Sequence, residues 1–194
     1  QVLVLLNRLK KDVSTGVLTI SGTGEMADAW SDSSCPWKSY RSSITSVIIE
    51  DGVTSIGTLM FHACHALTSV SIPNSVTIIE TSAFNSCSAL TSVAIPGSVV
   101  SIESSAFESC YDLASVTIEY GVTSIDYWAF QNCKSLTSLV IPGSVTSIGH
   151  EAFKNCSSLT SVSLPDSLTS IGYSAFLQCD SLTSVTVPPS VTDM

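Results

Sequence analysis

Residues 67–89 read LTSVSIPNSVTIIETSAFNSCSA, and near-copies of this 23-residue stretch fill most of the chain. Its cysteine returns every 23 positions, at Cys64, Cys87, Cys110, Cys133, Cys156 and Cys179. A period in the twenties with apolar residues at fixed offsets is typical of a solenoid, in which each repeat forms one coil. A single coil cannot bury its own apolar face, so the stacking of coils has to build the core.

We number the positions of a repeat from 1 to 23, with Leu67 at position 1 of the stretch quoted above. Apolar residues at positions 1, 4 and 6 alternate with polar ones, which predicts a short strand with one buried face. Pro73 and a turn residue follow, and positions 10 and 13 form a second short apolar pair. The Ala-Phe-x-x-Cys element near the end of the repeat, which begins here at Ala83, has the apolar spacing of one helical turn.

The repeat divides the chain into three parts. Residues 44–181 hold six complete repeats, and residues 182–194 hold a truncated seventh. Residues 1–43 do not follow the repeat, and the segment from 16 to 24 is typical of a strand with a glycine-rich turn. We expect residues 1–43 to form an N-terminal cap with β-hairpin character, since terminal repeats close an open apolar face. The last coil lacks an equivalent cap, so either the chain is a fragment of a longer array or this face meets a partner, for example by self-association.

The six repeat cysteines are predicted to be buried, unpaired thiols. In-register coils stand about 4.8 Å apart, whereas a disulfide needs Cβ atoms about 3.8 Å apart that point toward each other. Parallel side chains in a column do not meet that requirement. Cys35 lies outside the repeat and is the one thiol that we expect to react.

Charge and hydropathy exclude two classes of partner. The chain has 7 Lys and Arg against 16 Asp and Glu, a formal net charge of −9. Binding to a phosphate backbone needs clustered basic residues, so we expect no nucleic acid partner. No run of about 18 apolar residues occurs, so we expect no membrane insertion.

The repeat, with its Ile-Pro and Ala-Phe-x-x-Cys elements, resembles the BspA-like leucine-rich-repeat surface proteins, and GVLTISGTGEM (residues 16–26) is similar to their N-terminal part. Glu50 and Glu119 depart from the pattern by replacing the proline. The resemblance implies a leucine-rich-repeat solenoid, a right-handed β/α superhelix with short parallel strands, one helical turn per coil and a strand-lined concave side. It also implies a secreted or cell-surface protein that acts as an adhesin toward host matrix proteins or another cell surface. It carries no catalytic residue and implies no cofactor.

Aromatic side chains are the first candidates for partner binding, because binding hot spots are rich in Tyr and Trp. The candidates are Tyr111, Tyr120, Tyr127, Trp128, His150 and Tyr173. Three of them replace the serine or threonine of earlier coils at position 15, which predicts an outward stripe of rings one coil apart. The alternative is drift of the repeat, with the rings lying along the surface.

The outward positions of the first strand are the second candidate surface. This concave strand face is represented by Ser69, Ser92, Thr117, Ser138 and Ser161. Short side chains let a partner approach closely and lose little rotamer entropy on binding. The alternative is that serine and threonine only keep a β-strand soluble.

Position 14 stacks Glu80, Glu103 and Asp126 in consecutive coils. Like charges about 5 Å apart repel, so such a column either raises its pKa values or recruits a cation such as calcium. Tolerance by solvent and screening is the alternative. We therefore predict no firm metal site, with these three carboxylates as the only calcium candidate.

The sequence gives no support to catalysis. His62 and His65 flank Cys64, but the cysteine occupies a buried repeat position and a metal site needs several converging ligands. No nucleotide-binding fingerprint occurs.

We therefore expect a noncatalytic extracellular or cell-surface binding module that presents a repeat-built face to a protein or glycan. A structural segment that assembles end to end into a larger surface array is the alternative. Ice binding by ladders of short hydroxyl side chains is a minor third hypothesis.

Overall fold

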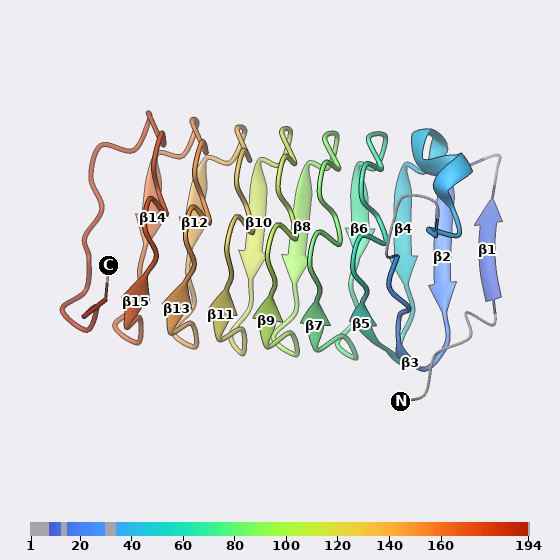
Figure 1. Cartoon of the computed structure of the whole chain (residues 1–194), viewed down its shortest axis with the longest axis horizontal. Helices are drawn as coiled ribbons and strands as arrows, with labels where there is room; N and C mark the ends of the chain where they lie inside the picture. The colour runs from blue at the N-terminus through green and yellow to red at the C-terminus, as the bar shows by residue number, and fades with distance from the viewer. Residues whose placement is uncertain (1–7, 13–14, 30–33, 194) are drawn as a thin grey trace.

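The computed structural model describes residues 8–12, 15–29 and 34–193, which form a parallel β-solenoid (Figure 1). Each coil runs along one short strand, turns, and returns along a second strand to a long turn on the opposite edge (Figure 1). Residues 23 apart pair across neighbouring coils, as Ser92 does with Ser115 and Ile95 with Ile118. The predicted solenoid is therefore confirmed, with one repeat per coil.

The first strands of the coils form one row of parallel strands, divided into three hydrogen-bonded groups: β2–β4–β6, β8–β10 and β12–β14. The bounds are β2 (Val17–Ser21), β4 (Ser46–Ile49), β6 (Ser69–Ser71), β8 (Ser92–Ile95), β10 (Ser115–Ile118), β12 (Ser138–Val140) and β14 (Ser161–Ser163). Side chains alternate between the two faces as predicted. In β8, Val93 and Ile95 are buried, whereas Ser92 and Ala94 are exposed.

The second strands form a continuous seven-stranded sheet along the whole array. Its bounds are β3 (Gly24–Glu25), β5 (Val53–Ile56), β7 (Ile78–Ile79), β9 (Ser101–Ile102), β11 (Ser124–Ile125), β13 (Ser147–Ile148) and β15 (Ser170–Ile171). From β7 onward each strand is two residues long, with the position-13 isoleucine buried and position 12 partly exposed. This sheet therefore holds position 14 and the following side chains at the same place in every coil.

The predicted helical turn is wrong, because the Ala-Phe-x-x-Cys element is a run of tight turns. Positions 16 and 20 have positive φ in every complete coil, as at Ser82 (56°) and Ser86 (61°). A helical turn needs consecutive right-handed residues, so these two positions interrupt it. Alternate amides then point to the next coil: Phe84 N donates to Ala106 O at 2.8 Å, while Asn85 N donates back to Ser82 O at 3.1 Å. The turn run thus adds a third hydrogen-bonded connection between coils, besides the two rows of strands.

A column of phenylalanine rings fills the centre of the solenoid. Phe84, Phe107 and Phe130 are fully buried, and their ring centroids stand 5.2 Å apart with planes within 7° of parallel. The column begins at Phe61 and ends at Phe176. Translational equivalence of the repeats therefore extends to the side chains of the core.

The repeat cysteines are buried and unpaired, as predicted. From the second coil on, each thiol donates to the carbonyl oxygen of the phenylalanine in the preceding coil, as Cys110 Sγ does to Phe84 O at 3.4 Å. Burial raises the pKa of the Cys64 and Cys110 thiols to about 12. The expectation for Cys35 is corrected, because this thiol is also buried and donates to Met60 O at 3.3 Å.

The N-terminal part covers the first coil with a coil of its own. β1 (Arg8–Asp12) pairs antiparallel with β2, and β2 and β3 continue the two strand rows. A 3₁₀-helix, η1 (Lys38–Ser43), leads into the first repeat. Trp37 lies just before it, stacks on Phe61 at 5.1 Å and donates from Nε1 to Met60 O at 2.8 Å. An indole therefore continues the phenylalanine column, while its polar N–H is satisfied.

Candidate binding site

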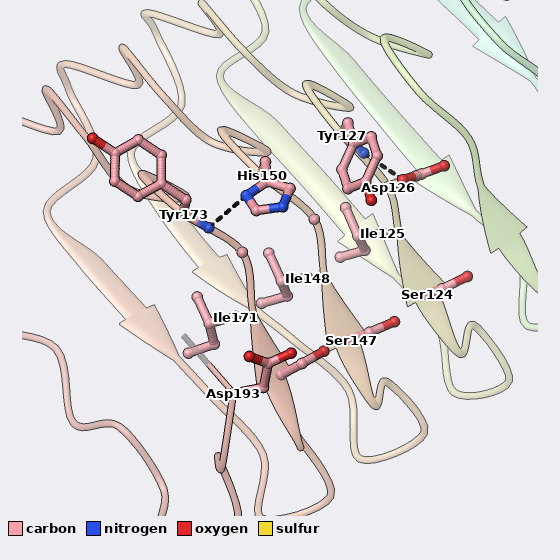
Figure 2. A pocket seen from close by; sticks show the side chains of 13 residues that line it. Ser124, Ile125, Asp126, Tyr127, Ser147, Ile148, His150, Ile171, Tyr173 and Asp193 are labelled. Atoms are coloured by element: carbon pink, nitrogen blue, oxygen red, sulfur yellow. Dashed lines mark hydrogen bonds between the residues drawn. The ribbon is translucent and has the colours of Figure 1, made fainter.

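The candidate site is a groove that crosses the carboxyl ends of strands β11, β13 and β15, in coils four to six. Its volume is about 420 Å³, and it is lined by residues 124–127, 147–150 and 170–173 together with Asp193 (Figure 2). These ranges are positions 12 to 15 of three successive coils. Because β11, β13 and β15 pair in register, each coil delivers the same set of positions to the groove.

Three aromatic rings stand along the groove at position 15. Tyr127 and Tyr173 are 47% and 72% exposed, and His150 lies between them (Figure 2). The rings of Tyr127 and His150 are 5.1 Å apart and tilted by 44°. The structure thus brings together the three residues that the sequence placed in one stripe.

The backbone amide of Tyr173 selects the tautomer of the neutral His150 ring. Tyr173 N lies 2.8 Å from His150 Nδ1 and donates to it, as Figure 2 shows. A neutral imidazole has one acceptor and one donor nitrogen, so Nδ1 as acceptor leaves the proton on Nε2. His150 therefore carries a donor N–H on the nitrogen that this bond does not use.

Glycines form the floor of the groove, and sequence analysis missed them. Position 14 is Gly149 in coil five and Gly172 in coil six, where coils two to four carry Glu80, Glu103 and Asp126. A Cβ added to Gly172 would lie 2.3 Å from His150 N, so only glycine permits this approach of the two coils. The sequence carries a partial signal, because the acid of position 14 gives way to glycine in coils five and six, one coil after position 15 becomes aromatic at Tyr127.

Polar groups complete the lining. Asp126 lies at one end, where Oδ1 accepts from Tyr127 N at 2.7 Å and Oδ2 accepts from Ser104 Oγ at 3.1 Å. Asp193, in the seventh coil, lies at the other end and contacts the sheet through its backbone, whose oxygen accepts from Ile171 N at 2.9 Å. Ser124, Ser147 and Ser170 supply hydroxyls between them. The lining therefore carries hydroxyls and carboxylates but no Lys or Arg side chain.

Trp128 lies next to Tyr127 but outside the groove lining. It is 44% exposed, and its Nε1 donates to Glu151 Oε2 at 3.2 Å. The same carboxylate accepts from Lys154 Nζ at 2.9 Å, and this ammonium holds the pKa of Glu151 below its usual range. Trp128 is thus held by a polar cluster on the long turns beside the groove.

The remaining two aromatic candidates lie on other edges of the coil. Tyr111, at position 22, packs under the Lys134 ammonium, which lies 5.2 Å from the ring centroid. Tyr120 is 77% exposed in the turn between β10 and β11, where its ring faces Gly143. Neither lines the groove, so the six aromatic candidates do not form one surface.

The strand-face candidates are exposed, as expected for outward positions. Ser69, Ser92, Thr117, Ser138 and Ser161 all belong to this exposed set. Ser69 Oγ donates to Ser46 Oγ at 3.1 Å on this face. The face also exposes Val140, at 67% of its surface. It offers short polar contacts with few large anchors.

The acidic column does not form the calcium site considered from the sequence. Within residues 8–12, 15–29 and 34–193, no group of three His, Cys, Asp or Glu side chains is placed to hold a metal ion. The carboxylates of Glu80 and Glu103 instead accept from Thr58 and Thr81 of the preceding coil, both at 3.2 Å. Asp126 accepts from Ser104 in the same way.

Glu80 lies beside Asp28 of the N-terminal cap. Burial, and then the hydrogen bond and charge of Asp28, raise the pKa of Glu80 to about 7. Asp28 also accepts from Thr58 N at 2.9 Å. The raised pKa thus reflects contact with the cap rather than repulsion along the column.

The segment around Cys64 is not arranged as a nucleophile. Its thiol is buried with a raised pKa, and a thiol rather than a thiolate is a poor nucleophile. His65 Nδ1 lies 2.9 Å from Ser86 O and is engaged with the next coil.

Within the described part of the chain, no helix has the length and apolar character needed to cross a bilayer.

The sequence matches the family model described as the BspA type leucine rich repeat region, in six copies over residues 39–157 and 123–194. No curated protein is significantly similar to the chain.

Solved structures share the fold. A leucine-rich repeat protein from Bacteroides ovatus is 30% identical with a TM-score of 0.73, over 97% of this chain and 47% of that one. The leucine-rich repeat protein of T. pallidum is 26% identical with a TM-score of 0.75, over 97% and 83% of the two chains. The pneumococcal vaccine antigen PcpA is 16% identical with a TM-score of 0.57, over 91% and 67%, and shares the fold alone. The chain thus spans less than half the length of the Bacteroides protein.

Proposed function

The chain belongs to the BspA-type leucine-rich repeat family, and from this premise we propose that it is a noncatalytic, adhesin-like binding module that presents a repeat-built face to a protein or glycan. One observation carries the proposal: coils four to six replace short polar side chains with exposed rings that border a groove. Exposed tyrosines on a rigid support are typical anchors of binding sites. The Ala, Phe and Cys columns of the core continue unchanged through these coils, so the replacement affects the surface.

The mechanism is recognition by a surface that is already ordered. Hydrogen bonds between strands and between turns hold each coil to the next, as at β11–β13 and from Phe130 N to Ala152 O. Little backbone entropy is then lost when a partner binds. Groove and strand face run along the array, so several weak contacts act together and display of many copies adds avidity.

The setting and the partner follow from the family resemblance. BspA-like proteins are surface proteins, and we propose a secreted or cell-surface location, with a host matrix component or another cell surface as the partner. The net charge of −9 disfavours anionic partners such as nucleic acid.

Surface plasmon resonance against a panel of matrix proteins and glycans tests the proposal. The triple variant Tyr127→Ala, Trp128→Ala and Tyr173→Ala should weaken binding by at least about tenfold, as expected when two or three hot-spot side chains are lost. The matched triple variant Ser92→Ala, Ser115→Ala and Ser138→Ala should change the affinity by less than about threefold. Equal losses would remove the aromatic site, and absence of binding to the whole panel would contradict the function.

End-to-end assembly into a larger array is the alternative. Phe176, Leu182 and Val191 pack against the core but remain partly exposed. A second copy stacked on this coil would bury them. Sedimentation velocity at rising concentration tests this: growth into longer species supports assembly, and a constant monomer excludes it.

A further inference from the structure

We infer that the groove on coils four to six binds a neutral, hydroxyl-rich glycan, with pyranose rings stacked on Tyr127 and Tyr173. The inference rests on the proposed binding function and adds the ligand chemistry of one site. A volume of about 420 Å³ lies in the range of small-ligand pockets, about 300–1,000 Å³. The groove therefore suits one or two sugar units of a longer chain.

The charge of the lining selects against anionic ligands. Asp126 and Asp193 lie at opposite ends of the groove, and no Lys or Arg side chain lines it (Figure 2). A sulfated or sialylated sugar would meet these carboxylates without a counter-charge, which is unfavourable at short distance. A neutral sugar instead donates its hydroxyls to them, and hydrogen bonds to a charged acceptor are stronger than neutral ones.

The rings suit the apolar faces of sugars. A pyranose has one face of C–H groups, which packs on the electron-rich face of an aromatic ring while the hydroxyls at its edge stay polar. Tyr173, 72% exposed, and Tyr127, 47% exposed, offer such faces without movement of the coil. In coils five and six, Gly149 and Gly172 place no side chain at position 14, so His150 and Tyr173 supply the side chains at positions 14 and 15 of these two coils.

The lining supplies hydrogen-bond donors and acceptors. His150 Nε2–H is available as a donor because Nδ1 accepts from Tyr173 N. Ser147 and Ser170 offer hydroxyls that both donate and accept. Sugar hydroxyls have the same dual character, so donors and acceptors along the groove can be matched at once.

The spacing of the groove disfavours an extended peptide. The side chains of the groove repeat at the spacing between coils. The ring centroids of Tyr127 and His150, which lie in neighbouring coils, are 5.1 Å apart. Side chains on one face of an extended peptide recur at about 6.6 Å, since each residue advances about 3.3 Å. A peptide laid along the groove would lose register with the rings after one coil.

Isothermal titration calorimetry with the full chain tests the inference. The neutral probes are cellotriose, maltotriose, mannotriose and N-acetylchitotriose, and the charged probes are sialyllactose and a heparin tetrasaccharide. We expect at least one neutral trisaccharide to bind and neither charged probe to bind. Tyr173→Ala should raise the Kd of the chain for this neutral trisaccharide about fivefold, which corresponds to the free energy of one aromatic contact. The double variant Tyr127→Ala, Tyr173→Ala should raise this Kd more than tenfold.

Matched variants separate stacking from loss of fold. Tyr173→Phe keeps the ring and should stay within about twofold of the wild type, and Tyr120→Ala removes an exposed tyrosine outside the groove and should have no effect. Preference for a charged probe, or equal loss from Tyr120→Ala, would overturn the inference. If no trisaccharide binds while a protein of the matrix panel does, the inference is wrong and the binding function stands. If neither binds, both fail.

Discussion

Coils two and three and coils five and six share the core columns of Ala, Phe, Cys and position-13 Ile, but they carry different residues on their surfaces. At positions 14 and 15, coils two and three carry Glu80–Thr81 and Glu103–Ser104, while coils five and six carry Gly149–His150 and Gly172–Tyr173. The first pair of coils builds hydrogen bonds from hydroxyl to carboxylate across neighbouring coils. The second pair builds a groove bordered by rings.

The difference shows that in this solenoid the residues that stabilise the fold are separate from the surface residues that are available for recognition. Phe84 and Phe153 are both fully buried although the surfaces above them differ completely. Each coil contacts only its neighbours, so outward positions vary without disturbing the column inside. A short run of coils can therefore acquire a binding site while the rest of the array stays a polar support.

If the two regions share one core, their thiols should be protected equally. Cys87 in coil two and Cys156 in coil five are fully buried, and Cys35 is buried in the cap. Labelling of all three by a maleimide should be at least about a thousandfold slower in buffer than in denaturant, because it requires opening of the fold. Mass spectrometry of the labelled peptides measures this. Rapid modification of Cys35 alone would show that its position in the cap is wrong.

Removal of one ring should cost the same in both regions. Phe84→Ala and Phe153→Ala each leave a cavity in the column, and each should lower the free energy of unfolding by about 3–5 kcal/mol. Urea unfolding followed by circular dichroism gives these values. A cost in one region less than half that in the other would contradict a shared core, and Val140→Ala on the strand face serves as the control.

The groove floor should tolerate no side chain. Gly172→Ala places a Cβ 2.3 Å from His150 N, so the coil has to shift, at a cost of about 1–3 kcal/mol. Gly143→Ala is the matched control, because the nearest atom to its Cβ is Tyr120 Cε2 at 3.9 Å. Thermal unfolding of the two variants compares them. Equal melting temperatures would mean that the close approach of coils five and six is not required.

The smallest expected effect concerns Glu80, the position-14 carboxylate next to the cap. Glu80 has a folded-state pKa of about 7, above the ordinary 4.5, so its contribution to stability is present below about pH 4.5 and is lost as pH rises through 7. Glu80→Gln should therefore raise the melting temperature at pH 8, by at most about 2–4 °C since the carboxyl is partly solvated, and have little effect below pH 4.5.

Glu103→Gln, at the same position one coil further from the cap, is its matched control. Calorimetry at pH 4, 6 and 8 follows both variants. A stabilisation by Glu80→Gln that is largest at pH 4 would reverse the sign and contradict the raised pKa.

The sequence alone determined the period, the strand positions and the columns of phenylalanine and cysteine. Equivalent residues in a repeating chain must occupy equivalent places, so Phe107 over Phe84 follows from a 23-residue spacing. The same reasoning placed Tyr127, His150 and Tyr173 in one stripe, since they share position 15.

Only the tertiary structure decided the features that depend on how neighbouring coils pack against each other. Left-handed residues such as Ser82 and Ser86 replaced the expected helical turn, because alternate amides pair with the neighbouring coil. Packing of the cap buried Cys35, and the closeness of backbones at Gly172 set the floor of the groove. Tyr111 and Tyr120 fell on other edges of the coil. A period fixes which residues are equivalent, but only packing fixes the distances and directions between them.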